Sequence, residues 1–143
     1  LIEDFQLITP EFTFDFELKF ESENLQENQL EVLANPVLLK QAFQNLLANC
    51  TVYSDSESAQ ISMGCEMQKT LQIVISNSGE PLLAEEQVML FEHFFRGKNS
   101  QGKVGFGLGL VLTKKIIQLT GGSIRYESKS TRQNSFLVTL PLR

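Results

Sequence analysis

The chain has 143 residues, of which 42% are hydrophobic and 20% are charged, and its formal net charge is -5. This composition is typical of one soluble globular domain, and the acidic balance argues against nucleic acid or an anionic membrane surface as a partner. No apolar run approaches the roughly 18 to 20 residues of a membrane-spanning helix, and the first residues lack the basic start of a signal peptide.

The two cysteines and the first residue bear on where the chain belongs. Cys50 and Cys65 show neither metal-ligand spacing nor a disulfide pattern, so small apolar fillers in the reducing cytoplasm are expected. Because the chain opens on Leu1 rather than methionine, we expect residues 1–143 to be one domain of a longer protein. That leaves room for a parent protein anchored in the inner membrane.

The first half of the chain predicts two strands and a long helix. Residues 12–20, FTFDFELKF, alternate strictly between apolar and polar side chains, which predicts a half-buried strand. A second, short strand is expected at residues 30–34. Asn35 followed by Pro36 predicts a helix start, with asparagine as the N-cap and proline in the first turn. The helix should run to Tyr53, with a core face made of Leu39, Ala42, Phe43, Leu46, Leu47 and Cys50.

The second half mixes strands and helices, which indicates α/β layers. Strands are predicted at residues 60–66, 71–76, 123–128 and 135–142. A helical stretch is expected at residues 85–95, followed by a polar loop at residues 96–103. A last helix, residues 110–119, should end in a left-handed turn at Gly121 and Gly122. Its core side is expected to hold Leu112, Ile116 and Leu119, with Val111 and Ile117 beside them.

Three glycines precede that last helix on alternate positions, in the stretch VGFGLGL: Gly105, Gly107 and Gly109. The spacing matches neither the G-x-G-x-x-G of a dinucleotide fold nor a P-loop. Glycines at the start of a helix let backbone N–H groups approach an anion closely, and the helix dipole favours negative charge there. Polyphosphate is the obvious anion, and a tight turn with no ligand is the alternative.

Two asparagines in the middle of the long helix ask for a reason. Asn45 and Asn49 are four residues apart, so they share a face with Gln41 and Tyr53, which we expect to lie opposite the apolar side. Asparagine is a poor residue for a helix interior. An amide oxygen suits Mg²⁺, which completes its octahedron with water and phosphate oxygens. A solvated polar face is the alternative on this helix alone.

Four segments in this order resemble the catalytic, ATP-binding domain of sensor histidine kinases, in the superfamily shared with gyrase B and MutL. QNLLANCTVYS resembles the N box, ISNSGEPL the first glycine box, FEHFFRG the F box and GFGLGL the second glycine box. The resemblance spans roughly residues 30–142. It implies a two-layer α/β sandwich of the Bergerat type, with a mixed sheet covered on one face by helices. Residues 1–10 would be the remnant of a linker from a missing dimerisation domain.

The resemblance also implies an ATP site and its residues. Asn49 matches the magnesium-binding asparagine, and Asn45 occupies the position where hydrolases of the superfamily carry a water-activating glutamate. Because an amide cannot act as a general base at neutral pH, Asn45 favours transfer to a protein over hydrolysis. Tyr53 would flank the nucleotide. The other positions assigned to the nucleotide are Asn77, Gly79, Arg96, Lys103, Gly105, Gly107, Leu108 and Gly109.

This chain departs from the family pattern at several positions. Asn77 stands where an aspartate receives the adenine amino group; it still accepts that hydrogen bond, but without a charge. ATP binding is therefore expected to be retained and weakened by roughly 1 kcal/mol. Pro81 replaces the second glycine, and Val52 replaces a basic residue often found before the tyrosine. Arg96 has two interpretations, a phosphate contact or a surface ion pair.

The function implied is that of the ATP-binding catalytic domain of a two-component sensor histidine kinase, a phosphotransferase in signal transduction. With ATP and Mg²⁺ bound, the γ-phosphoryl group would pass to a histidine on the dimerisation domain of the same protein, and then to a response regulator. That histidine is absent here, so little self-phosphorylation is expected of the isolated chain. The alternatives are a non-catalytic nucleotide-sensing or scaffold module, and an ATPase of the gyrase or MutL kind, which Asn45 disfavours.

Overall fold

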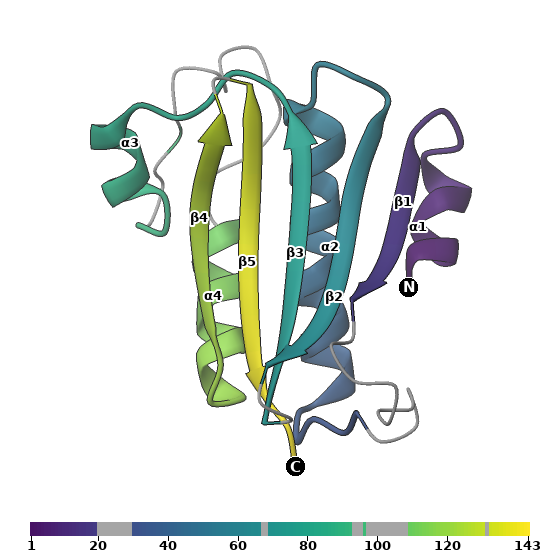
Figure 1. Ribbon diagram of the computed structural model, residues 1–143, viewed down its shortest axis with the longest axis vertical. Coiled ribbons are helices and arrows are strands. Elements are labelled where there is room, and N and C mark those ends of the chain that lie inside the picture. The colour runs from purple at the N-terminus through teal and green to yellow at the C-terminus, as the bar shows by residue number, and fades with distance from the viewer. Residues whose placement is uncertain (20–29, 67–68, 93–95, 97–108, 131) are drawn as a thin grey trace.

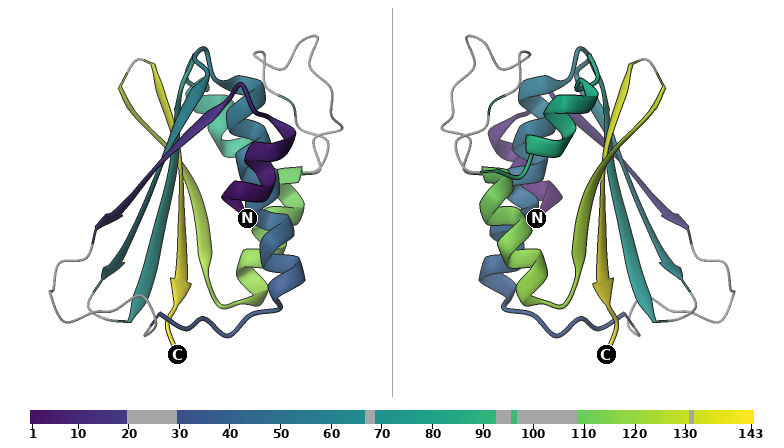
Figure 2. Two further views of the ribbon diagram at one scale, coloured as in Figure 1. Left: turned by 90° about the vertical axis from the view of Figure 1, so that its right-hand side faces the viewer. Right: turned by 90° about the vertical axis from the view of Figure 1, so that its left-hand side faces the viewer.

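The computed structural model describes residues 1–19, 30–66, 69–92, 96, 109–130 and 132–143. In these residues a five-stranded sheet has the order β1-β2-β3-β5-β4. β1 runs parallel to β2, and the other neighbours are antiparallel. The helices α2 and α4 lie together on one face of this mixed sheet (Figures 1 and 2). The predicted two-layer α/β sandwich is confirmed.

The elements follow the predicted order, except that a helix is added at the start and residues 30–34 form no strand. The helices are α1 (Ile2–Ile8), α2 (Pro36–Tyr53), α3 (Ala84–Met89) and α4 (Gly109–Leu119). The strands are β1 (Thr13–Lys19), β2 (Ser58–Glu66), β3 (Thr70–Ser78), β4 (Ser123–Ser130) and β5 (Gln133–Pro141). Helix α1, which the sequence analysis does not predict, is joined to α2 by an ion pair of 3.0 Å between Asp4 and Lys40.

The strand predicted at residues 30–34 is wrong. This segment has no regular secondary structure, although Arg143 N donates a backbone hydrogen bond of 2.8 Å to Glu31 O. Leu30 and Val32 pack partly against the core. Apolar residues that anchor an irregular segment to the core therefore explain why the sequence suggested a strand here.

Helix α2 begins and ends at the predicted residues. Asn35 caps it, because its Oδ1 accepts hydrogen bonds from Val37 N at 3.0 Å and Leu38 N at 3.2 Å. The predicted apolar face is confirmed as buried or partly buried against the sheet. Burial raises the pKa of the Cys50 thiol to about 12, so it stays protonated as an apolar filler.

Helix α4 is rotated relative to the prediction. Leu112 and Leu119 were expected in the core, but they are 46% and 78% exposed. Thr113 is fully buried instead, because its hydroxyl donates to Gly109 O at 2.8 Å and lies 3.4 Å from Ala42 O. With its hydroxyl satisfied, this small side chain can face α2. The buried residues of α4 are Val111, Thr113, Ile116 and Ile117.

Two predictions concern the segments on either side of α4. As predicted, α4 is followed by a left-handed glycine, Gly121, with φ of 76°. The helix predicted at residues 85–95 is shorter, since α3 ends at Met89 and residues 93–95 lie outside the described residues. Phe91 follows α3 and lies 5.4 Å below the ammonium of Lys114.

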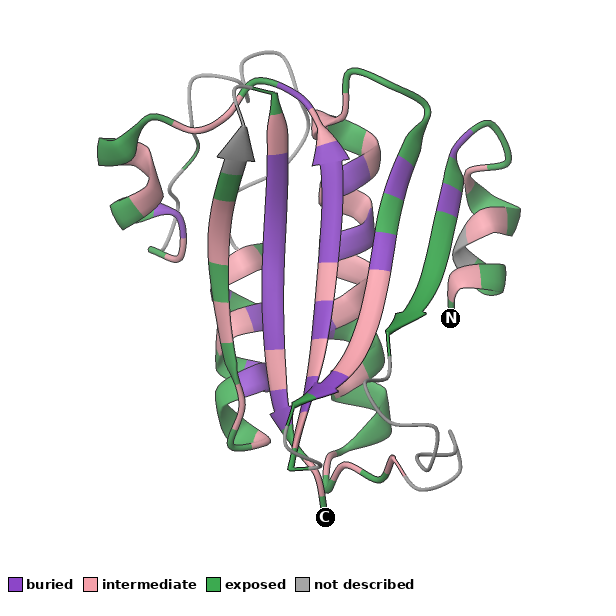
Figure 3. Cartoon of the chain, viewed as in Figure 1, coloured by how far each residue is buried: buried purple, intermediate pink, exposed green. Residues whose placement is uncertain are grey.

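The sheet carries polar residues to the edge of the core at the end of β3. Leu71, Ile73 and Ile75 face the helices on alternate positions, and Asn77 continues the same face. Buried residues concentrate in β3 and β5 (Figure 3). Asn77 is paired with Asn134 of β5, and both side chains are buried. Two amides therefore lie where the apolar core ends.

Candidate functional site

The second half of α2 carries three of the predicted site residues in one stripe. Asn45, Asn49 and Tyr53 recur every four residues and extend over about 12 Å of helix. All three are half-buried rather than facing solvent. The expectation that this stripe lies opposite the apolar side is wrong, because α4 packs along α2 and covers its flank. The amides therefore border the core.

Asn45 joins α2 to the first turn of α4. Its Nδ2 donates to Gly109 O and to Thr113 Oγ1, both at 3.3 Å. Within the described residues no donor reaches its Oδ1. The structure thus brings Asn45 and Gly109 together, with an amide beside the N-terminus of a helix, where partial positive charge favours anions.

Asn49 lies one turn further along α2, and its side chain forms no hydrogen bond with any described residue. The described part of the chain also contains no group of three or more His, Cys, Asp or Glu side chains that could hold a metal ion. An amide oxygen is nevertheless suitable for Mg²⁺, which binds through few protein ligands when phosphate supplies the others. The residues therefore fit a magnesium ion that arrives with a polyphosphate.

Gly79 packs directly against the end of α2. A Cβ atom at this position would lie 2.6 Å from Tyr53 O and 3.2 Å from Asn134 Nδ2, which leaves no space for any side chain. Gly79 N donates to Arg132 O at 3.1 Å. The turn after β3 is therefore held against Tyr53, and the close approach requires glycine.

Asn77 lies immediately before this turn and is 6% exposed. Its Nδ2 donates to Ser78 O at 3.0 Å, so the amide orientation leaves Oδ1 as the available acceptor. Among the described residues nothing donates to that oxygen. Since buried polar atoms normally have a partner, Asn77 is suited to accept a hydrogen bond from a ligand.

The remaining predicted residues belong to the segment before α4. Arg96 is exposed, with undescribed residues on both sides. Lys103, Gly105, Gly107 and Leu108 lie outside the described residues. Of the glycine run, Gly109 alone is described, as the first residue of α4. The structure therefore brings Asn45 and Gly109 together at one end of the stripe, and Tyr53, Asn77 and Gly79 together at the other, with Asn49 between them on α2.

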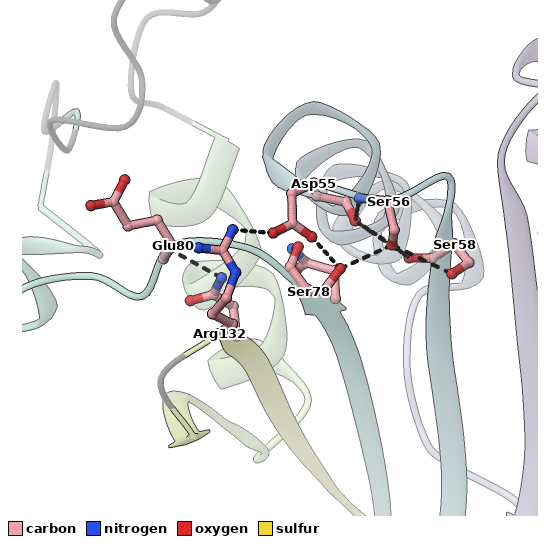
Figure 4. A network of polar contacts seen from close by, with 9 residues as sticks. Asp55, Ser56, Ser58, Ser78, Glu80 and Arg132 are labelled. Atoms are coloured by element: carbon pink, nitrogen blue, oxygen red, sulfur yellow. Dashed lines mark hydrogen bonds and ion pairs between the residues drawn. The ribbon is translucent and has the colours of Figure 1, made fainter.

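A polar network at the tip of the sheet supports the end of the stripe at Tyr53 and Gly79 (Figure 4). Asp55 accepts a hydrogen bond of 2.5 Å from Ser78 Oγ and pairs with Arg132. The Ser78 bond, followed by the Arg132 bond, lowers the pKa of the Asp55 carboxyl. Ser56 Oγ lies 2.9 Å from Ser78 Oγ. This network ties the loop after α2 to the ends of β3 and β5.

Sequence reasoning did not identify Thr113, Tyr126 or Asn134 as site residues. Thr113 could have been suspected as a polar residue four positions after Gly109 and within an apolar helix. Asn134 begins the described buried run of the last strand, where an amide is unusual. Tyr126 gave no such signal, because its hydroxyl bonds Leu82 N, 44 residues earlier, and Asn134 Oδ1 on the neighbouring strand.

A hollow of about 680 Å³ lies on the opposite face of the sheet. It contains the carboxylates of Asp15, Glu17 and Glu66, with Lys19 paired to Glu17. Excess negative charge disfavours a polyphosphate there. The α2 stripe is therefore the better candidate for an anionic ligand.

Comparison with known proteins gives matches at the level of both sequence and fold. A family model described as histidine kinase-, DNA gyrase B-, and HSP90-like ATPase matches residues 34–143. The sensor histidine kinase HprS of Escherichia coli (strain K12) is 37% identical over 114 residues, which are 79% of this chain and 25% of that protein.

Solved structures of histidine kinases have a similar fold. The catalytic domain of histidine kinase ThkA has a TM-score of 0.74 and 25% identity, and the match covers 99% of this chain and 90% of that one. The mycobacterial sensor histidine kinase MprB has a TM-score of 0.82 and 21% identity, with 99% and 91% covered.

The match has a definite extent. The chain spans about a quarter of the length of the curated relatives it matches. Among the helices of the described residues, none has the length and apolar character needed to cross a membrane.

Proposed function

Because this chain belongs to the histidine kinase-, DNA gyrase B- and HSP90-like ATPase family, and is an ATP-binding domain of the sensor histidine kinase type, we propose that it presents Mg-ATP for phosphoryl transfer to a histidine. That histidine would lie on a separate dimerisation domain of the same protein, to which residues 1–10 would be the linker. The phosphoryl group would then pass to a response regulator. Because ATP is supplied in the cytoplasm, the domain would work there.

The observation that carries this proposal is the pairing of groups along α2. Asn45 contacts Gly109 at the start of α4, and Tyr53 contacts Gly79 after β3. Positive helix-terminal charge therefore lies near one end of the stripe and a buried hydrogen-bond acceptor near the other. A nucleotide has a polyanion at one end and a base with an amino group at the other, which matches that polarity.

At the base end, Asn77 Oδ1 would accept the hydrogen bond of the adenine amino group. The hydrogen bond from Asn77 Nδ2 to Ser78 O supports this orientation of the side-chain amide. The hydrogen bond from the adenine amino group to Asn77 Oδ1 would be neutral, so it would be weaker than one made to a carboxylate. Gly79 would let the backbone approach the base closely, and Tyr53 would flank the nucleotide.

At the phosphate end, Asn45 and Asn49 would face the triphosphate beside the backbone of Gly109. Asn49 would supply an oxygen ligand to Mg²⁺, which neutralises phosphate charge when bound. Arg96 and Lys103 would approach the phosphates as cations. Backbone donors would come from Gly105, Gly107 and Gly109, with Leu108 also at the nucleotide.

The chain's own contribution to the reaction is positioning. An imidazole nitrogen of the acceptor histidine would attack the γ-phosphorus, a P–N bond would form, and the bond to the β-phosphate oxygen would break to release ADP. Asn45 cannot remove a proton from water, and its Nδ2 donates to Gly109 O and Thr113 Oγ1. Water is therefore a poor competitor, and the phosphoryl group is kept for the histidine.

A second candidate function is a non-catalytic nucleotide sensor or scaffold. The observation in its favour is the altered turn, with Asn77 and Pro81 in place of the acidic residue and glycine of the family pattern. The kinase and the nucleotide sensor both bind ATP, so these two differ in whether the phosphoryl group is transferred. They are separated by supplying the dimerisation domain of the parent protein together with this chain and Mg-ATP.

Calorimetric titration of Mg-ATP into the isolated domain tests the shared premise. We expect saturable binding, a rise in melting temperature with ATP concentration, and little self-phosphorylation of the chain alone. Transfer of labelled phosphate to the added dimerisation domain supports the kinase. Binding without any transfer favours the nucleotide sensor, and absence of binding contradicts the kinase and the sensor and favours the scaffold.

A further inference from the structure

The turn after β3 is held by side chains from the last two strands. Leu82 N donates to Tyr126 Oη at 3.1 Å, and the Tyr126 hydroxyl donates in turn to Asn134 Oδ1. Asn134 Nδ2 then donates to Glu80 O at 3.3 Å. These hydrogen bonds form one continuous path from Leu82 through Tyr126 and Asn134 to Glu80. The path holds the backbone on both sides of Pro81.

The path is partly shielded from water. Asn134 is 8% exposed, and Tyr126 is half-buried with its ring edge-on to Phe136, at 5.8 Å between centroids. A buried polar network in which each member has a partner makes its surroundings rigid. Asn134 is also the cross-strand partner of Asn77 and lies against Gly79. The same amide therefore supports both the turn and the residues beside it.

We propose that Tyr126 and Asn134 are positioning residues of the nucleotide site, which hold residues 79–82 in the binding conformation before the nucleotide arrives. The inference rests on the proposed function, since it assumes that the adenine base binds at Asn77. Neither side chain needs to touch ATP. Pro81 has no N–H to donate, so the turn depends on bonds made by its neighbours.

The physical consequence concerns the cost of ordering. A turn that is already fixed loses no conformational freedom when the base binds. Removal of the Tyr126 hydroxyl would leave Leu82 N and Asn134 Oδ1 without their partner and would let the turn adopt other conformations. Nucleotide affinity should then fall although no contacting group has been removed.

The variant Tyr126→Phe tests this, because it keeps the ring and its packing on Phe136. We expect the Kd for Mg-ATP to rise about fivefold. Amide hydrogen exchange measured by NMR should accelerate at Leu82 while amides in the centre of β3 stay protected. The matched control is Ser123→Ala, which removes a 2.7 Å bond to Thr139 at the far end of the same strand pair. It should change neither quantity.

Asn134→Ala gives an independent check on the path. If Tyr126 and Asn134 act through one chain of hydrogen bonds, the double variant Tyr126→Phe/Asn134→Ala should bind ATP no more weakly than Asn134→Ala alone. If Asn134→Ala does not fold, the Tyr126→Phe data decide by themselves.

The outcomes separate this inference from the function on which it rests. If wild type does not bind ATP, the proposed function fails and the inference with it. If wild type binds and Tyr126→Phe binds equally well, the inference alone is overturned. It is also overturned if the loss of affinity comes with faster exchange throughout the sheet, or if Ser123→Ala reproduces it, because the role would then be general stability.

Discussion

The two ends of the candidate site are built in different ways. At Gly79 the backbone of the turn touches the end of α2, and buried amides make hydrogen bonds around it. At Gly109 the site has half-buried amides beside an exposed helix terminus, with room for atoms to be added. An end built from close packing should be sensitive to added atoms, whereas an end built from donors and ligands should be sensitive to lost polar groups.

The strongest way to break this comparison is to add one methyl group at each end. Gly79→Ala would force a Cβ against Tyr53 O, a backbone atom that cannot move aside. We expect the free energy of unfolding to fall by about 1–3 kcal/mol and ATP affinity by about 30-fold. Urea unfolding and calorimetry measure the two effects.

Gly109→Ala is the control for that substitution. Its Cβ would lie 3.9 Å from Asn45 Cγ, an ordinary contact, and alanine is favoured over glycine in a helix. Its stability should therefore stay the same or rise. If both alanine variants lose equal stability, the packing difference between the two ends is wrong.

Loss of a polar group at the phosphate end is the next largest expected effect. Asn49→Ala should weaken Mg-ATP binding about tenfold and leave the melting temperature of the free domain nearly unchanged, since its amide bonds no described residue. Titrations with and without Mg²⁺ measure this, and the difference between them should shrink in the variant. Gln41→Ala, an exposed residue two turns earlier, is the control. Equal losses in both variants would contradict a specific role for Asn49.

Asn77→Asp sharpens the comparison by adding charge at the base end. A carboxylate makes a stronger bond to the adenine amino group, so we expect about fivefold tighter ATP binding at neutral pH. The same change removes the donor to Ser78 O, so the ATP-free domain should melt at a lower temperature. Calorimetry and thermal melts measure the trade-off. Tighter binding should not occur if the base lies elsewhere.

The smallest expected effect is the pH dependence of the network at the tip. Ser78 and Arg132 lower the pKa of Asp55 in the folded state below its ordinary value of about 3.9. The carboxylate therefore stabilises the fold above that pH, and its contribution is lost as the pH falls through the lower folded pKa. Asp55→Asn should melt slightly below wild type at pH 7, by an amount that salt reduces, and the gap should close as the pH falls through the lowered pKa of Asp55. A gap that stays constant with pH would exclude this origin.

Sequence patterns predicted those parts of the fold whose causes are local. The start of α2 follows from Asn35 and Pro36, and the existence of β1 follows from its alternation. The predicted apolar face of β1 is only partly correct, because Phe14 is buried whereas Phe16 and Leu18 are exposed. Helix α1 has seven residues, too few for a periodic signal. The face of α4 depends on Thr113 meeting Ala42 of another helix, a contact that no pattern within α4 contains.

The site divides in the same way. The sequence predicted that Asn45 and Asn49 share a helix face, because they are at positions i and i+4. Asn77 and Gly79 were visible through the resemblance of their motif. The sequence did not predict the support from Tyr126 and Asn134. Their side chains bond the backbone of Leu82 and Glu80, more than 40 positions away, and this depends on how the strands pair.

A crystal structure of the domain with Mg²⁺ and a non-hydrolysable ATP analogue tests the central claim most directly. The account predicts the adenine amino group within hydrogen-bonding distance of Asn77 Oδ1, and the triphosphate with its metal ion beside Asn49 and the start of α4. An analogue seated in the hollow on the open face of the sheet, or with its base at Asn49 and its phosphates at Gly79, would contradict it.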